Sequence, residues 1–228
     1  MITVAAQAQW LDNTVITHDF WPAVGETLAM SLVSTFFSVV FGTLIGLLLV
    51  GTAPRGLFPN RVVNQIIGVI VNIGRSIPFV ILMIALIPFT RLVAGTTLGW
   101  RATVIPLTVA AIPFFARLVE TNILSVDQGK VEAAKMMGAT RRQIMFGVLV
   151  REAMPALIQS TAVLLISVIG YSAMAGVLGA GGLGALALNY GYTQFMTDVM
   201  IVTVVGIIII VEIVQVIGDM VSRMVDHR

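Results

Sequence analysis

The sequence contains no cysteine, and only 11% of its 228 residues are charged. Without cysteine, the chain cannot form a disulfide or use thiol chemistry. Hydrophobic residues make up 58% of the chain, and a soluble domain of this length could not bury so many apolar side chains. The scarcity of charge therefore excludes a soluble protein and predicts one whose solvent is a lipid bilayer.

Residues that usually perform catalysis are scarce as well. The two histidines, His18 and His227, stand near opposite ends of the chain, and no His and carboxylate cluster has the spacing of a metal site. No Walker A sequence is present, so we expect no ATP site in this chain. The first 27 residues contain no Lys or Arg, whereas a secretory signal peptide begins with a basic region, so we expect none.

Long hydrophobic runs fill most of the remaining sequence. A membrane-spanning helix needs about 20 mostly apolar residues, and five segments satisfy this requirement. We predict an all-α polytopic membrane protein with an external or interfacial segment at 1–27, a transmembrane domain at 28–218 and a tail at 219–228. The expected spans, the third of them interrupted by Pro106 and Pro113, are residues 28–50, 66–88, 102–118, 156–178 and 199–218.

The distribution of Lys and Arg predicts the orientation, because cytosolic loops of membrane proteins are enriched in these residues. With the N-terminus outside, ten of the thirteen fall on the cytosolic side, two (Arg91 and Arg101) fall outside, and Arg75 lies within a span. This distribution places the C-terminus in the cytosol, together with the loop at 120–155.

That loop contains the longest hydrophilic segment, Val126–Pro155, with five of the thirteen basic residues. We expect two short helices separated at Gly138, a residue suited to the position after a helix C-cap. Thr140 and Gln143 have the spacing of a capping box, which predicts that the second helix begins at once. Such a hairpin suits a cytosolic protein partner, although it could also rest its basic side chains on anionic lipid.

Three features of the spans bear on transport. Arg75 is costly in a bilayer and predicts a position on a water-filled path or inner gate, or else snorkelling to the cytosolic surface. Met174 projects from small neighbours, so two copies meeting on a dimer axis could close a narrow pore. Six glycines between Gly176 and Gly191 predict a tightly packed external re-entrant loop.

The sequence Glu132-Ala133-Ala134, with Gly138 four positions after Ala134, resembles the coupling loop of type I ABC importer permeases. In that family the loop docks in a groove on the ATPase subunit, and an isoleucine-x-leucine-proline sequence follows nine residues after the glycine. Arg151 stands here where the family has proline, which leaves the exit geometry of the second helix open. The resemblance implies that Glu132, Ala133, Ala134, Gly138 and Arg141 couple this chain to an ATPase.

Three further segments resemble methionine-uptake permeases: residues 72–79, residues 87–91, and residues 170–174 with the glycines that follow. The resemblance implies a second copy of the chain, two cytosolic ATPase subunits that bind ATP and Mg²⁺, and an extracytoplasmic substrate-binding lipoprotein. It implies no cofactor in this chain, no nucleic-acid partner, and a place in the cytoplasmic membrane of a bacterium. We expect the gate and translocation path to include Met174, Arg75, Ser76, Pro78, Tyr171 and Ser172.

Two other classes of protein are compatible with parts of the sequence. An ion-coupled secondary transporter could use Glu212, an acid well inside the fifth expected span, as a proton or cation site. A membrane scaffold would explain the cytosolic loop but not Arg75 or the small residues at 170–176. Co-purification with an ATPase would separate the first hypothesis from both alternatives.

Overall fold

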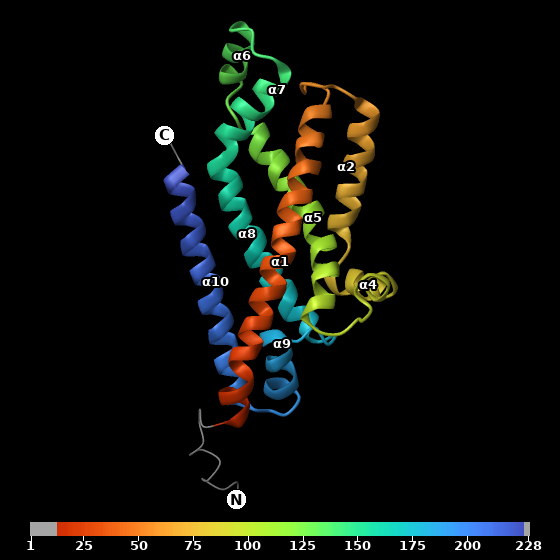
Figure 1. Ribbon diagram of the computed structural model, residues 1–228, viewed down its shortest axis with the longest axis vertical. Coiled ribbons are helices and arrows are strands. Elements are labelled where there is room, and N and C mark those ends of the chain that lie inside the picture. Colours follow the sequence, from red (N-terminus) through yellow and green to blue (C-terminus); the bar gives the residue numbers. More distant parts are fainter. Residues whose placement is uncertain (1–12, 226–228) are drawn as a thin grey trace, which may run out of the picture. The chain divides into compact units, whose positions relative to one another are not determined.

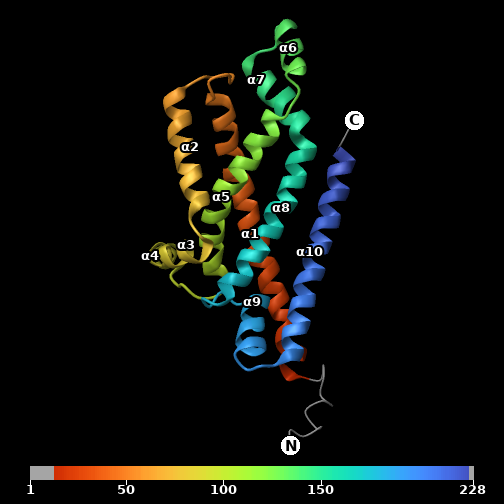
Figure 2. The same ribbon diagram turned by 180° about the vertical axis from the view of Figure 1, so that it is seen from behind.

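The computed structural model describes residues 13–225, and each regular element in this range is a helix. Figures 1 and 2 show the helices from opposite sides, coloured along the chain. The elements are α1 (Thr14–Thr52), α2 (Arg61–Ser76), α3 (Phe79–Ala85), α4 (Ile87–Ala94), α5 (Trp100–Leu124), α6 (Gln128–Met136), α7 (Arg141–Gln143), the π-helical η2 (Ile144–Val150), α8 (Arg151–Gly176), α9 (Gly182–Leu186), the π-helical η3 (Ala187–Tyr192) and α10 (Thr197–Val225).

Four helical runs are long and apolar enough to cross a membrane: α1, α5, the continuous run from α7 to α8, and α10. A fifth is present if α2 and α3, which meet at a sharp bend, together form one span. The prediction of an all-α polytopic membrane protein is confirmed. The exact count of five spans and the orientation with the N-terminus outside remain predictions.

The helix that contains the first expected span, α1, begins at Thr14 and runs for 39 residues, so the polar residues before Leu28 do not stop it; the start of the span itself at Leu28 stays a prediction. The expected interruption of the third span at Pro106 and Pro113 was wrong, because α5 continues through both without a break. Proline is tolerated inside membrane helices because neighbouring groups satisfy the backbone that it frees. Residues 1–12, the rest of the expected interfacial segment, lie outside the described residues.

The chain divides into two compact units. Within the described residues, unit 1 contains residues 13–34, 79–107 and 166–213, and unit 2 contains residues 35–78, 108–165 and 214–225. Helices α1, α5, α8 and α10 each contribute one part to both units. The expected gate residues Tyr171, Ser172 and Met174 therefore belong to unit 1, whereas Arg75 and the coupling hairpin belong to unit 2.

Small residues determine how closely α1 and α5 approach in unit 2. A Cβ added at Gly42 would lie 3.0 Å from the side chain of Phe115, and one at Gly46 would lie 2.6 Å from that of Val119. The two glycines form a G-x-x-x-G pair, which lets membrane helices pack backbone to backbone. Apolar residues of α2 and α5 continue this core, where Leu49, Val71 and Ala116 are buried together.

Hydroxyl side chains line much of the buried face of α1, beside the large apolar side chains of Met30 and Leu49. Thr27, Ser31, Ser34, Thr35 and Ser38 are all at least nine-tenths buried. The Ser34 hydroxyl donates to the carbonyl of Val104 within unit 1, and the Ser38 hydroxyl donates to that of Thr108 within unit 2. Small polar residues on an interhelical face are typical of membrane proteins, where lipid supplies no hydrophobic drive for helix association.

Candidate functional site

The hairpin at residues 127–150, which we call the coupling hairpin, extends from one end of unit 2 (Figure 1). Asp127 caps its first helix, because the side chain accepts a hydrogen bond of 2.8 Å from the amide of Gly129. Val131 and Ala134 bury one face of α6. The helix ends in Met136 and is followed by Met137, and these side chains are 90% and 82% exposed. An exposed pair of methionines on a short polar helix is a surface suited to a protein partner.

Gly138 ends α6 with a left-handed turn, as the sequence predicted. Its φ is +79°, a conformation that costs glycine nothing and other residues about 1–2 kcal/mol. The Gly138 amide donates to the carbonyl of Lys135, and the Ala139 amide donates to that of Ala134, both at 3.0 Å. These two bonds form a Schellman motif, which satisfies carbonyls at the end of α6 and turns the chain toward Thr140.

The capping box at Thr140 is confirmed. The Thr140 hydroxyl accepts from the Gln143 amide, and the Gln143 side chain accepts from the Thr140 amide at 2.8 Å. The expectation of a second short helix was wrong, however, because the helix that begins at Arg141 continues through η2 and α8 to Gly176. Arg151 is helical and provides a backbone amide to this run where a proline could not. The second helix of the coupling hairpin is therefore continuous with a candidate membrane span.

Side-chain contacts fix the coupling hairpin to unit 2. Lys130 of α6 and Glu152 of α8 form an ion pair. The Arg141 guanidinium lies over the Phe58 ring, 5.8 Å from its centroid, an arrangement that favours the cation electrostatically. Glu132, Ala133 and Arg142 remain exposed. Of the predicted coupling residues, Ala134 and Gly138 shape the hairpin, Arg141 anchors it, and Glu132 and Ala133 present its outer surface.

The predicted gate residues of unit 1 lie on the last turns of α8. The Tyr171 ring stacks on Phe79, with centroids 5.0 Å apart and planes at 11°. Ser172 is buried, and its hydroxyl donates to the carbonyl of Ile169 at 2.7 Å. Met174 is 51% exposed. The position of Ser172 therefore suits a role in packing, whereas Met174 is accessible to another molecule.

The glycine segment after α8 packs as tightly as the sequence predicted. A Cβ at Gly184 would lie 2.4 Å from the carbonyl oxygen of Ala173, and one at Gly176 would lie 2.3 Å from the amide of Ala185. Only glycine allows backbones to approach so closely. The sequence showed this packing but not the helix within it, since α9 and η3 occupy residues 182–192. This contact holds the end of α8 that includes Met174.

Glu26 and Thr27 of α1 secure the same segment, and the sequence analysis missed both. The Glu26 carboxylate accepts a hydrogen bond of 2.7 Å from the amide of Gly182, and the Thr27 hydroxyl accepts one of 2.9 Å from the amide of Leu183. These acceptors satisfy the first free amides of α9. An acid at the start of an apolar run was the available signal, but it was assigned to the external segment.

The other predicted path residues belong to α2 and the bend after it. Arg75, Ser76 and Pro78 are all exposed. The Ser76 hydroxyl donates to the carbonyl of Asn72 at 2.8 Å, one helical turn earlier. Ile77 is extended, as expected of a residue before proline, and α2 therefore ends at Ser76.

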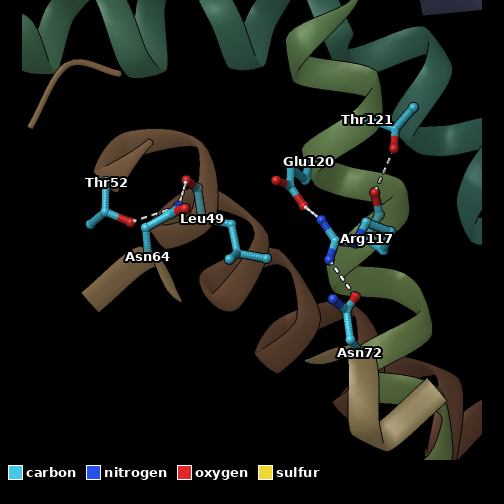
Figure 3. Close-up of polar contacts among 7 residues, drawn as sticks. All are labelled: Leu49, Thr52, Asn64, Asn72, Arg117, Glu120 and Thr121. Carbon is cyan, nitrogen blue, oxygen red and sulfur yellow. Dashed lines mark hydrogen bonds and ion pairs between the residues drawn. The ribbon is translucent and has the colours of Figure 1, made fainter. Parts of the chain in front are cut away.

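A polar cluster next to Arg75 was also missed by the sequence analysis. Figure 3 shows Arg117 of α5 between two partners. One guanidinium nitrogen forms an ion pair with Glu120, and the other donates to the side-chain oxygen of Asn72 at 2.6 Å. Side-chain exposure is 29% for Arg117 and 15% for Glu120. Asn72 was noticed only as part of a sequence motif, because no local pattern shows which residue of α5 it contacts.

A second asparagine joins α2 to α1. Asn64 donates to the Leu49 carbonyl at 2.8 Å and to the Thr52 hydroxyl at 3.3 Å (Figure 3). The carbonyls in the last turn of a helix have no partner within it, so this side chain satisfies an otherwise open group.

Within residues 13–225, no group of three His, Cys, Asp or Glu side chains has metal-binding geometry.

A model of the family described as "Binding-protein-dependent transport system inner membrane component" matches residues 38–228. The Probable D-methionine transport system permease protein MetI of Vibrio cholerae is 44% identical over 223 residues, 97% of each chain. The Methionine import system permease protein MetP of Bacillus subtilis is 47% identical over 220 residues, 96% of this chain and 99% of the relative.

A solved structure of the MetNI methionine ABC transporter in an inward-facing conformation is similar to this chain. Its TM-score is 0.91 at 43% identity, covering 94% of this chain and 100% of the other. Nearly the whole fold is therefore shared. This chain belongs to the family of binding-protein-dependent transport system inner membrane components, the permease subunits of ABC importers with the type I fold.

Proposed function

We propose that this chain is the permease subunit of an ATP-driven importer of methionine in the cytoplasmic membrane of a bacterium. The observation that carries the proposal is the similarity, over almost the full chain, to the permease of the MetNI methionine ABC transporter. The relatives named as methionine permeases support the same cargo. The chain serves as the translocation subunit, and ATP with Mg²⁺ binds to a partner ATPase.

The coupling hairpin supports a mechanical link to that ATPase. Its outer surface is exposed, with Glu132 and Ala133 on α6 and the two methionines at its end. Its inner surface is fixed by the Lys130–Glu152 ion pair and by a helix continuous with a membrane span. A displacement of the hairpin by the ATPase would therefore act directly on the helix that continues into α8. Such a displacement is the kind of motion by which a transporter alternates access to its path.

The proposed assembly contains two copies of this chain, two ATPases and an extracytoplasmic substrate-binding lipoprotein. In this assembly Met174, Tyr171 and Ser172 belong to the gate region, and Arg75, Ser76 and Pro78 belong to the path. The stack of Tyr171 on Phe79 would keep the gate turn of α8 in a fixed rotation.

Reconstitution tests the proposal directly. Proteoliposomes that contain permease, ATPase and binding protein should accumulate labelled methionine only when ATP and Mg²⁺ are available to the ATPase. Labelled norleucine, which replaces the thioether sulfur by a methylene group, is the matched control for cargo specificity. Uptake driven by an ion gradient without ATP would refute the proposal in favour of a secondary transporter that uses Glu212. Equal uptake of an unrelated amino acid would refute the methionine assignment alone.

A further inference from the structure

Helix α2 has three distinct faces, although it is only 16 residues long. At 3.6 residues per turn, Ile67, Val71 and Gly74 share the face that packs within unit 2. Val71 is 2% exposed, and a Cβ at Gly74 would lie 2.7 Å from the ring of Pro113 in α5. This face accounts for only about a third of the helix circumference.

The second face is apolar and exposed. Its side chains are each more than half exposed and suit contact with lipid acyl chains; they are Val62, Ile66, Val69, Ile70 and Ile73. An apolar surface of this size is ordinary for a helix at the lipid boundary.

The third face, which we call the polar face of α2, is lined with polar or small residues, which are exposed except for the half-buried Gly68. Each residue of an α-helix is rotated by about 100° from the one before it, and on this geometry the face occupies an arc of about 100° around the helix axis. Its members are Arg61, Gln65, Gly68, Asn72, Arg75 and Ser76. A Cβ added at Gly68 would meet nothing within 4 Å, so the middle of the face is open. A charged and amide-rich face at membrane depth needs water or a polar ligand, because lipid solvates neither charge nor amide.

The polar face offers donors and positive charge. Two ion pairs form among residues 13–225, Arg117–Glu120 and Lys130–Glu152, and Arg75 takes part in neither. Glu120, the acid of the polar cluster in Figure 3, is paired with Arg117. The oxygen of Asn72 is also occupied by Arg117, which leaves its amino group to donate. The face therefore favours an anionic group that accepts hydrogen bonds.

We propose that the polar face of α2 lines the aqueous translocation path and that Arg75 receives the carboxylate of the amino-acid cargo as it passes. The inference rests on the proposed import of methionine and extends it to a specificity-determining residue. A guanidinium suits this role, because its fork of N–H donors matches both oxygens of a carboxylate. Arg117 acts as a positioning residue. By occupying the side-chain oxygen of Asn72, it leaves the amino group of that side chain to donate toward the path.

Single cysteines test the orientation of the faces, and the natural absence of cysteine means that each variant has one thiol in this chain. Gln65→Cys, Gly68→Cys and Ser76→Cys probe the polar face, and Ile66→Cys and Ile73→Cys are matched controls on the apolar face. The full complex in liposomes is treated with membrane-impermeant anionic and cationic methanethiosulfonates, and modification is measured on the permease chain. The polar-face thiols should react at least about tenfold faster than the controls, since a thiol needs water to ionise.

The two reagents also test the role of Arg75. At about 6 Å in a watery path, one unit charge changes the rate of each reagent roughly threefold in opposite directions. The ratio of anionic to cationic rates at Ser76→Cys should therefore fall about tenfold when Arg75→Gln is added, and Arg75→Lys should preserve it. Methionine should slow modification of Ser76→Cys, whereas methioninamide, which lacks the carboxylate, should not.

The outcomes separate this inference from the proposed function. Equal reactivity on the two faces would overturn the assignment of the path, and an unchanged reagent ratio in Arg75→Gln would overturn the role of Arg75. If either result were found while the unmodified complex imported methionine normally, the inference about α2 and Arg75 would be refuted and the proposed function would stand. Loss of methionine uptake with the reactivity pattern intact would refute the cargo and leave an anion-selective path. Co-purification of the ATPase with Arg75→Lys shows that the charge-preserving variant has folded.

Discussion

Replacement of Gly138 tests whether the shape of the coupling hairpin transmits the work of the ATPase. The φ of +79° at this position lies in the left-handed region, and a Cβ placed there would meet no atom within 4 Å. A larger residue therefore meets no steric obstacle. Its whole effect comes from the backbone conformation that the Schellman motif requires.

The expected costs form a graded series. Alanine in the left-handed region costs about 1–2 kcal/mol, and a β-branched residue costs up to roughly 3 kcal/mol. Asparagine tolerates this conformation and should cost only a few tenths of a kcal/mol. Each 1.4 kcal/mol is a factor of ten in an equilibrium. In Gly138→Ala, the population of the native hairpin conformation should therefore fall about five- to thirtyfold relative to competing conformations. In Gly138→Val the fall should reach about a hundredfold.

The assay combines ATP-driven methionine uptake in proteoliposomes with co-purification of the ATPase. We expect Gly138→Asn to resemble the unaltered protein, Gly138→Ala to be reduced and Gly138→Val to lose both activities. The permease should still insert in the membrane, since no core residue is disturbed. Gly25→Ala is the matched control, because a Cβ added at Gly25 would also meet no atom within 4 Å, whereas Gly25 has no positive φ.

Two results would refute this reasoning. Normal uptake by Gly138→Val would show that the hairpin does not need its left-handed turn for coupling. Equal damage from Gly138→Asn and Gly138→Val would show that the loss depends on a side chain at the interface with the ATPase and not on backbone conformation.

Three further changes test other parts of the molecule. Met174→Cys should form a disulfide with its counterpart in a resting dimer if two copies meet on the axis, since the Cα atoms must then lie within about 7 Å; no crosslinked dimer under oxidising conditions would contradict this. Thr140→Ala removes a helix cap worth about 1 kcal/mol and should speed hydrogen exchange at the amides of α7 about fivefold, and unchanged exchange would show that the cap is redundant. Gly184→Ala places a methyl group 2.4 Å from the Ala173 carbonyl oxygen and should lower the free energy of unfolding by about 1–3 kcal/mol or more, as measured by thermal unfolding in detergent. The control is Gly170→Ala, whose methyl group meets no neighbour within 4 Å. Equal stability of the two variants would contradict the close packing.

Local interactions explain why parts of the coupling hairpin could be predicted from sequence. The turn at Gly138 and the capping box at Thr140 each depend on residues within five positions of one another. Such contacts follow from residue type and spacing, so the sequence predicted both. The continuation of the second helix to Gly176 was missed, because the hydropathy pattern marks where a segment becomes apolar and not where a helix begins.

The sequence by itself determined the class of the protein, since a chain with 58% hydrophobic residues and 11% charged residues is stable only in a bilayer. It also determined the hairpin turn and the tight packing after α8. Only the tertiary structure decided which distant residues meet, such as Arg117 with Asn72 and Glu26 with Gly182. Those contacts depend on the rotation of each helix about its axis, and that rotation is set by packing against neighbouring helices. The close approach of Gly74 in α2 to the ring of Pro113 in α5 is one such packing contact. The helical spacing of α2 gathers its polar residues on one face, but only the packed structure decides how far this face remains exposed.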